Sequence, residues 1–376
     1  MRKLKLNVDE LLPRLSQVVN VVNSKNSMAI LGSVVFQTNA NGLTVTASDS
    51  ETWLTISVPN ATFDEPMTFC VIASDIHRVL SNLKGKELEM TLDDESHTVE
   101  CNYGKGRFTL PFESADDFPR PSMDMSDATT KEINAVNLLQ AIEKTSFAIA
   151  NDKLRPIMNG IHFDFFAYGM VSVATDGQKL AKHTDKTIVI VDDDTPMGFT
   201  LPKKPSNIVL GLLNGCETMI DLTFNDKCAI FKNGDFVMMT RLLEGNYPHY
   251  DRVIPVDNTI ETNVNKAEII EALKRVLPLG NESSQLVRLS FAMGQVTIFA
   301  EDVNFSKSAD ESVECDYASQ ELSIGFNGGY LMEILQSIDG ENVKICMKEP
   351  SRAGLFKPSD VDENSEYVSL LMPIFV

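Results

Sequence analysis

The sequence lacks the features that mark a membrane, secreted or zinc-binding protein. No run approaches about 18 consecutive apolar residues, so no membrane-spanning helix is predicted. The N-terminal MRKLKLNVDELL has basic residues but no apolar run after them, unlike a signal peptide. The 6 cysteines form no CxxC pair and are too sparse in a chain of 376 residues for a disulfide framework. We therefore expect a cytoplasmic protein with reduced, buried thiols.

Signatures of catalysis are missing as well. The sequence contains no GxSxG, Walker A, GxGxxG or HExxH motif. The acidic run Asp192–Asp194 resembles a metal cluster, but its place between a β-type run and TPMGF favours a solvated loop, as for Asp116–Asp117 and Asp49. The histidines are scattered, at His77, His97, His162, His183 and His249. We expect no catalytic residue, metal or cofactor, although an α+β enzyme acting on nucleotides or carbohydrates stays open as an alternative.

Basic charge is scarce. The chain has 33 Lys plus Arg against 53 Asp plus Glu, a formal net charge of −20. This excludes an overall basic coat for nucleic acid but allows a local basic stripe. The apolar content of 43% is that of an ordinary globular protein, which excludes disorder or a coiled coil for the whole chain.

Several weak signals repeat along the chain with a period near 128 residues. Ala47–Asp49, Ala174–Asp176 and Ala300–Asp302 each end an alternating β-type run, at spacings of 127 and 126 residues. Phe118-Pro119 and Tyr247-Pro248 lie 129 residues apart. Further signals are the pair PMTF and PMGF and the amphipathic helices expected at 9–22, 135–150 and 265–279. The period is too long for a solenoid, so it predicts three similar domains.

Each repeat has the same expected order of elements: a helix, alternating strands, a second helix and more strands. The second helices are expected at 73–84, 203–213 and 327–338. Asn41-Gly42 and Asn233-Gly234 are typical of tight turns between paired strands. We predict an α+β fold of three repeated domains, each with two helices packed on an antiparallel sheet, at 1–125, 126–256 and 257–376. The polar stretches 121–131 and 256–264 are the expected connections.

Four segments in this order resemble the bacterial DNA polymerase III beta subunit family, the β sliding clamps. They are AILGSVVFQT, NGIHFDF followed by VATDGQKLA, GNYPHYDRVIP and YVSLLMPIFV. The resemblance covers the whole chain. It implies a non-catalytic processivity factor with three clamp domains per chain, forming a half-ring. Two chains would join head to tail into a ring around duplex DNA and recruit the polymerase alpha subunit, the clamp loader and other proteins that carry a clamp-binding motif. A static scaffold that never encloses DNA is the competing hypothesis.

The charge distribution fits this resemblance loosely. The six expected helices carry nine basic and seven acidic residues, so most of the acidity lies outside them. Contacts to phosphates should then be few and weak, which suits a protein that slides. The candidate DNA-binding residues are Lys25, Arg78, Asn151, Lys153, Lys203, Lys204 and Lys274.

The resemblance also implies a groove between the second and third domains that takes short peptides. It is expected to offer flexible apolar contacts with a few polar groups at the edge. Its implied residues are Arg155, Met158, Thr175, Gly177, Gln178, Lys179, Leu180, Pro248, Arg252, Val253, Asn327, Tyr330, Arg352, Leu370, Met372, Pro373 and Ile374. The residues alone favour another interpretation, in which VATDGQKLA is a strand and turn packed in the core and LLMPIF is a buried terminal strand.

The implied dimer interface joins the first domain of one chain to the third domain of the other. An apolar centre with complementary charges around it is expected, although alternation also allows Phe108 and Leu110 to face their own core. The candidate residues are Lys105, Arg107, Phe108, Leu110, Leu277, Leu279, Glu301 and Glu311.

Overall fold

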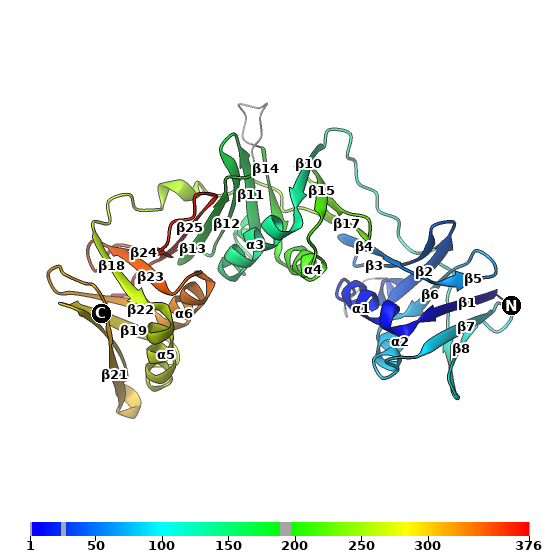
Figure 1. Cartoon of the computed structure of the whole chain (residues 1–376), viewed down its shortest axis with the longest axis horizontal. Coiled ribbons are helices and arrows are strands. Elements are labelled where there is room, and N and C mark those ends of the chain that lie inside the picture. The colour runs from blue at the N-terminus through cyan, green and yellow to red at the C-terminus, as the bar shows by residue number, and fades with distance from the viewer. Residues whose placement is uncertain (1, 24–27, 189–196, 376) are drawn as a thin grey trace. The chain divides into compact units, whose positions relative to one another are not determined.

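The computed structural model describes residues 2–23, 28–188 and 197–375, which hold six α-helices and 25 β-strands (Figure 1). Lys25 and Asp192–Asp194 lie outside the described residues. The chain divides into two compact units. Unit 1 comprises residues 1–136 and 207–242, and unit 2 comprises 137–206 and 243–376. Each unit is described by itself.

Unit 1 contains an eight-stranded and a five-stranded antiparallel sheet. The eight-stranded sheet has the order β10 (Thr129–Asn134), β15 (Met219–Phe224), β16 (Cys228–Lys232), β17 (Phe236–Arg241), β4 (Thr52–Val58), β3 (Gly42–Ser48), β2 (Ser33–Asn39) and β6 (Thr68–Ile72). The five-stranded sheet has the order β5 (Thr62–Phe63), β1 (Arg2–Asn7), β7 (Glu87–Asp93), β8 (Thr98–Tyr103) and β9 (Gly106–Pro111). Helices α1 (Val8–Val19) and α2 (Ala73–Leu80) pack against each other, and α1 also packs on β3 and β4.

Unit 2 repeats this plan with an eight-stranded and a four-stranded sheet. The larger sheet has the order β14 (Met197–Pro202), β11 (Gly160–Phe166), β12 (Gly169–Thr175), β13 (Lys179–Asp185), β25 (Ser365–Leu371), β24 (Gly354–Pro358), β23 (Asn342–Met347) and β18 (Ile260–Asn265). The smaller has the order β21 (Lys307–Glu314), β20 (Gln295–Asp302), β19 (Leu286–Ala292) and β22 (Leu322–Asn327). Helix α5 (Lys266–Val276) packs on α6 (Gly328–Ser337) and on β21.

In each unit one strand pairing joins a repeat to the next. We call the β4–β17 pairing of unit 1 the first seam and the β13–β25 pairing of unit 2 the second seam. Thr52 pairs with Thr240 in the first, and Lys179 pairs with Leu371 in the second. The middle repeat therefore contributes strands to both units. The helices α3 (Ala135–Thr145) and α4 (Lys203–Leu213) belong to this repeat.

The three repeats share a capping residue that the periodic patterns do not reveal. Asn7, Asn134 and Asn265 each end a first strand, and each side-chain oxygen accepts a hydrogen bond from the main chain of the next helix. The donors are Asp9 N at 2.8 Å, Val136 N at 2.9 Å and Glu268 N at 3.1 Å. Asparagine is favoured there because it satisfies an otherwise unpaired N–H of the first helical turn. This asparagine is a further sign of the repeat that can be read in the sequence.

The predicted α+β fold is confirmed, and the six helices lie at the expected places. The strands of each repeat, however, divide between two sheets instead of forming one. The stretches 121–131 and 256–264, expected to be plain connections, run into β10 and β18. Both strands are rich in polar residues and only partly buried, with the sequences TTKEIN and IETNVN. An edge strand buries few side chains, so it lacks the apolar alternation by which strands are recognised.

Candidate functional site

The candidate groove begins at a tight turn between β12 and β13. The Asp176 carboxylate accepts hydrogen bonds from Gln178 N at 2.8 Å and Lys179 N at 2.9 Å. The Thr175 hydroxyl accepts from Gly177 N at 3.1 Å. Gly177 has a φ of +91°, a conformation that residues with a Cβ rarely adopt. A Cβ there would also lie 3.5 Å from the Arg155 guanidinium, so Arg155 stands directly beside the turn.

Below the turn lies an apolar cluster. Leu180 on β13 pairs with Leu370 on β25, and both are almost completely buried. Tyr250, from the short 3-10 helix Tyr250–Arg252, packs into the same cluster. Other members are Val171, Val173, Cys346, Ala353 and Leu355. The second seam therefore has an apolar floor next to a polar turn.

The C-terminal segment continues from β25 as one wall. Met372 N donates to Gln178 O at 2.8 Å, and Ile374 N donates to Gly325 O at 2.8 Å. These bonds hold the segment at both ends while Met372 keeps 46% of its surface exposed. Pro373 and Ile374 are half-buried. Flexible apolar side chains held on a fixed backbone suit contacts with varied ligands.

Lys179 and Tyr330 form a further part of the wall. The Lys179 ammonium lies 4.1 Å above the centre of the Tyr330 ring and is ion-paired with Glu333. Its side chain is only 5% exposed. The charge is thus engaged inside the protein, where it holds the Tyr330 ring by a cation–π contact. Asn327 caps α6 by accepting from Tyr330 N at 3.0 Å.

The segment 246–253 supplies the most exposed candidates. Pro248, Arg252 and Val253 are exposed, Val253 by 58%. Met158, by contrast, is buried, and Arg352 is ion-paired with Asp257. All 17 implied groove residues lie in unit 2, but they differ in accessibility. Pro248, Arg252, Val253, Gln178 and Met372 are open to a ligand, whereas Leu180, Leu370 and Met158 are buried beneath.

Three family profiles match this chain end to end. They describe the N-terminal, central and C-terminal domains of the DNA polymerase III beta subunit, at residues 2–124, 132–249 and 251–374. The chain belongs to the DNA polymerase III beta subunit family. It is therefore a sliding-clamp subunit of DNA replication and a non-catalytic accessory subunit.

Individual relatives agree over the full length. The beta sliding clamp of Haemophilus influenzae is 29% identical over 97% of this chain and 98% of that protein. The beta sliding clamp of Caulobacter vibrioides is 26% identical over 100% of both chains. A crystal structure of the DNA polymerase sliding clamp from Pseudomonas aeruginosa, 25% identical, superposes with a TM-score of 0.89 and covers 100% of both chains.

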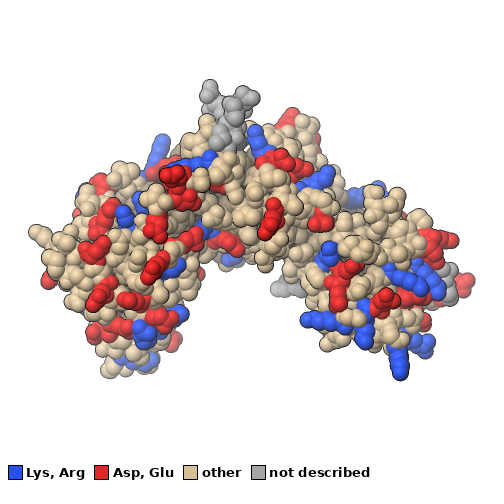
Figure 2. Space-filling view, in the orientation of Figure 1, with Lys and Arg blue, Asp and Glu red and all other residues tan. Residues whose placement is uncertain are grey.

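The candidate DNA-binding residues that are described lie on helices and one loop. Arg78 on α2 is ion-paired with Asp75 at 3.3 Å, and Lys274 on α5 with Glu271 at 2.8 Å. Lys203 and Lys204 begin α4, while Asn151 and Lys153 lie exposed in the loop after α3. On the face drawn in Figure 2, acidic and basic side chains are intermixed in both units. Such intermixing favours weak and mobile phosphate contacts.

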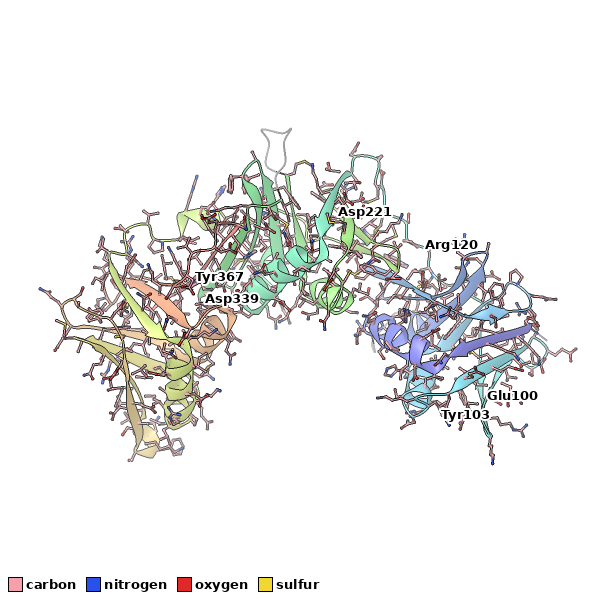
Figure 3. All side chains as sticks on the ribbon, viewed as in Figure 1. Glu100, Tyr103, Arg120, Asp221, Asp339 and Tyr367 are labelled. Carbon is pink, nitrogen blue, oxygen red and sulfur yellow. The ribbon has the colours of Figure 1, made fainter. Side chains whose placement is uncertain are left out.

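The candidate interface residues fall on two edge strands. Arg107, Phe108 and Leu110 lie on β9, at the edge of the five-stranded sheet. Arg107 lies 3.8 Å from Glu100, and the Phe108 ring packs 6.0 Å from the Tyr103 ring. Glu100 and Tyr103 are labelled in Figure 3. Lys105 is exposed in the turn before β9. Glu311 lies on β21, the edge of the four-stranded sheet, where it is ion-paired with Arg275 at 2.6 Å. Leu277 and Leu279 form a short 3-10 turn after α5, and Glu301 is exposed at the end of β20.

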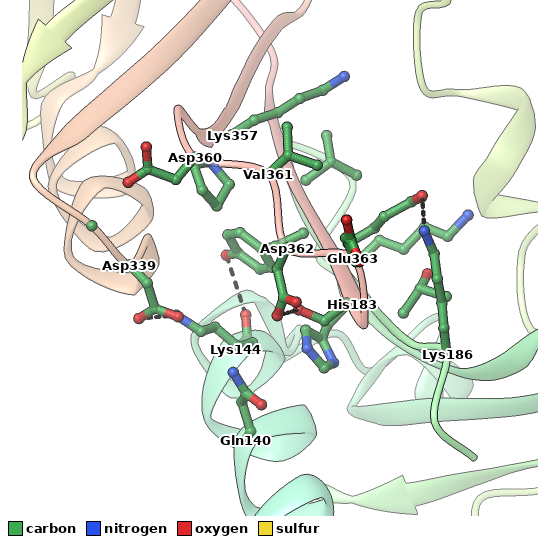
Figure 4. A pocket seen from close by; sticks show the side chains of 18 residues that line it. Gln140, Lys144, His183, Lys186, Asp339, Lys357, Asp360, Val361, Asp362 and Glu363 are labelled. Atoms are coloured by element: carbon green, nitrogen blue, oxygen red, sulfur yellow. Dashed lines mark hydrogen bonds and ion pairs between the residues drawn. The ribbon is translucent and has the colours of Figure 1, made fainter.

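A separate cavity of about 540 Å³ lies at the far end of β13 and β25 (Figure 4). Its Lys144 pairs with Asp339 at 2.6 Å, and Lys186 pairs with Glu366 at 2.6 Å. His183 is 1% exposed, and burial lowers its pKa. These pairs join α3 and β13 to the last repeat. We assign no ligand to this cavity.

Membrane and metal features are absent from the part of the chain that the structure describes. No helix in it is long and apolar enough to cross a membrane. Nor do the described side chains contain a group of three His, Cys, Asp or Glu residues placed to hold a metal ion.

Proposed function

We propose that two copies of this chain close head to tail into a ring around duplex DNA. The repeats 1–125, 126–256 and 257–376 would be its clamp domains, and the ring would act in the cytoplasm. The main support is the way in which equivalent strands of successive repeats pair within the chain. Strands β4, β13 and β21 hold the same place in the three repeats, as do β17, β25 and β9. Two of the three possible pairings are made within the chain. Strands β21 and β9 are the edges left over.

The internal seams also indicate the register of the missing one. Thr52, Lys179 and Lys307 each begin their strand. Each stands one residue before the matching hairpin pair, which is Ser48–Trp53, Thr175–Leu180 or Glu301–Ser308. Their partners Thr240 and Leu371 correspond to Leu110, because Leu110 pairs with Val99 as Thr240 pairs with Ala229. Lys307 should therefore lie opposite Leu110 of the second copy.

That register makes chemical sense of the charges. Counting along the antiparallel strands sets Arg107 of the second copy opposite Asp310. Phe108 and Leu110 would add apolar contacts next to this charged pair. Leu277 and Leu279 lie in the turn directly after α5, the helix that packs on β21. Opposite charges facing each other across a pairing set both register and partner. Pairing would also remove two exposed edges that are prone to aggregation.

Disulfide crosslinking tests this arrangement. Thr109 and Ser308 are exposed and would lie directly opposite each other, at a Cα separation of about 5 Å that a disulfide can span. The variant Thr109→Cys/Ser308→Cys should form a crosslinked dimer of twice 41.6 kDa under mild oxidation. The control Thr109→Cys/Asp310→Cys is shifted by two residues and should crosslink poorly. Equal crosslinking in both, or a monomeric mass at micromolar concentration, would reject the register or the dimer respectively.

Enclosure of DNA needs its own test. A ring holds DNA by topology, so weak contacts from residues such as Lys153, Lys203 and Lys204 are sufficient. Clamp loaded on nicked circular DNA should stay bound in high salt and be lost when the circle is linearised. A static scaffold would show the same retention on both forms.

We further propose that the groove at the second seam binds peptides of the polymerase alpha subunit, the clamp loader and other partners. Support comes from exposed Met372 and Val253 above the buried Leu180–Leu370 floor. Met372→Ala/Ile374→Ala should leave the dimer folded and weaken an alpha-subunit peptide by at least about tenfold, or 1.4 kcal/mol. Unchanged affinity by calorimetry would overturn the groove assignment.

A further inference from the structure

The segment that carries Pro248, Arg252 and Val253 has almost no main-chain anchorage. Among the described residues, the backbone hydrogen bonds of 244–254 stay within the segment. They join Arg252 N to His249 O at 3.2 Å and Val253 N to Tyr250 O at 3.3 Å. Such a segment keeps its position only if side chains hold it.

Three side-chain contacts provide that hold. The Tyr250 hydroxyl donates to Asp164 Oδ2 on β11 at 2.7 Å. The Tyr247 ring stacks on His162 with centroids 4.5 Å apart and planes 2° apart. Lys182 on β13 pairs with Asp251 at 2.6 Å. The first two contacts converge on neighbouring positions of one strand.

His162 and Asp164 are themselves linked into a partly buried relay of hydrogen bonds. His162 Nε2 lies 3.1 Å from Asp164 Oδ1, and His162 Nδ1 lies 2.9 Å from the Thr200 hydroxyl on β14. An ionised Asp164 accepts from both Tyr250 and His162, so the imidazole hydrogen belongs on Nε2 and Nδ1 accepts from Thr200. Gly198 makes room for the carboxylate, because a Cβ there would lie 2.4 Å from Asp164 Oδ1.

Electrostatics supports an ionised Asp164. Burial alone would raise its pKa, but the hydrogen bonds from His162 and the Tyr250 hydroxyl, with the charge of Lys182, lower the pKa below its usual value. Burial and the contact with Asp164 raise the pKa of Tyr250, so it stays a donor. The hydrogen bond is therefore charge-assisted, the stronger kind.

The first repeat shows that the architecture does not require this relay. Val35 and Cys70 pair across β2 and β6 as His162 and Thr200 pair across β11 and β14. Phe118 packs on Val35 and Cys70 in an apolar cluster, where the middle repeat has Tyr247. The polar contacts of His162 and Asp164 thus occur in the middle repeat, next to the seam where the groove is proposed. An all-apolar cluster suffices where no groove is formed.

We propose that Asp164, His162 and Tyr250 are positioning residues for peptide binding: they touch no peptide, but they hold the Pro248–Val253 wall of the groove in its binding position. This inference rests on the proposed groove. It predicts that breaking the contacts among Asp164, His162 and Tyr250 lowers peptide affinity only through the Pro248–Val253 wall. The contribution of Met372 to affinity should be unaffected.

The test uses the full-length protein and a synthetic peptide carrying the clamp-binding segment of the DNA polymerase III alpha subunit from the same organism. Tyr250→Phe removes one hydroxyl and should weaken the peptide about tenfold, the effect expected of one charge-assisted hydrogen bond. The matched control Tyr317→Phe removes a buried hydroxyl that donates to Gln320 O beside the four-stranded sheet. It should leave affinity unchanged. Melting temperatures of both variants report any general loss of stability.

Double-mutant cycles separate positioning from a merely structural role. Tyr250→Phe should be non-additive with Val253→Ala and additive with Met372→Ala. Additivity with both, or unchanged affinity in Tyr250→Phe while Met372→Ala weakens binding, overturns the inference but leaves the groove standing. If the wild-type protein does not bind the peptide, the groove and this inference both fail. Asp164→Asn, which keeps the shape but loses the charge, should give a smaller loss than Asp164→Ala.

Discussion

The first seam in unit 1 and the second seam in unit 2 start from nearly the same turn. Asp49 accepts from Glu51 N at 3.1 Å and Thr52 N at 2.8 Å, as Asp176 does from the corresponding amides. Ser50 has a φ of +76° where Gly177 has +91°. The two seams differ in the side chains that come after the turn.

The two seams differ in the size of one buried side chain. Trp53 stands where Leu180 stands, is 7% exposed, and donates from its indole to Pro119 O at 3.0 Å. At the edge, Arg241 pairs with Glu51 at 3.3 Å where unit 2 has exposed Met372 beside Gln178. One fold position is thus filled by a large ring beside an ion pair in the first seam, and by leucine beside an exposed methionine in the second, where we propose the peptide groove.

Trp53→Ala should have the largest effect on stability and should distinguish the first seam from the second. Removing this buried ring is expected to cost about 3–5 kcal/mol of unfolding free energy, measured in urea. Peptide affinity should not change, because the groove lies in unit 2. Leu180→Ala is the counterpart and should lower both stability and affinity. Equal loss of peptide binding in the two variants would contradict the contrast.

Placing the ion pair of the first seam at the matching positions of the second seam should weaken peptide binding. Gln178→Glu/Met372→Arg recreates the Glu51–Arg241 pair on unit 2 and is expected to lower peptide affinity about tenfold, or 1.4 kcal/mol, by calorimetry. The reverse change, Glu51→Gln/Arg241→Met, removes an exposed ion pair and should alter stability by less than about 1 kcal/mol. It should not affect peptide binding.

The two turns should respond differently to a change of side chain. Gly177→Ala forces a Cβ into a positive-φ conformation and beside Arg155, at a cost of about 1–2 kcal/mol in thermal unfolding. Ser50→Gly relieves the same strain but raises the conformational entropy of the unfolded chain. The two effects oppose each other, so stability should change by less than about 1 kcal/mol. A larger effect at Ser50 than at Gly177 would show that the turns are not equivalent.

The smallest expected effect is the pH dependence caused by Asp164, which has no charged counterpart at the matching position of unit 1. The pKa of Asp164 is lowered on folding, so its stabilising effect is present above the ordinary carboxyl pKa of about 3.9 and is lost as pH falls through the folded value. The matching residue in unit 1 is uncharged Gln37. The stability difference between wild type and Asp164→Asn, about 1 kcal/mol in urea at pH 7, should shrink below about pH 4. A difference that stays constant to pH 3 would exclude an ionised Asp164.

Local patterns were sufficient for the helices and turns, but not for the polar edge strands β10 and β18 or for the partners of the strands. The turns at Asn41-Gly42 and Asn233-Gly234 were readable because each depends on residues close in sequence. Gly42 has a positive φ, and the Asn233 side chain accepts hydrogen bonds from Asp235 N and Phe236 N. The pairing of Thr52 with Thr240 was not readable, since strands so far apart in sequence carry no mark of each other. Lys179 is among the residues implied for the groove, yet the structure engages its charge with Glu333 and Tyr330.

The sequence by itself determined the threefold repeat, the α+β class and the family, because periodicity, caps and turns are encoded by neighbouring residues. Only the tertiary structure decided which strands meet at the seams, that Trp53 and Leu180 take matching buried places there, and that Asp164 reaches Tyr250. Those outcomes depend on side chains brought together from distant segments, and their energies exist only once the chain has folded.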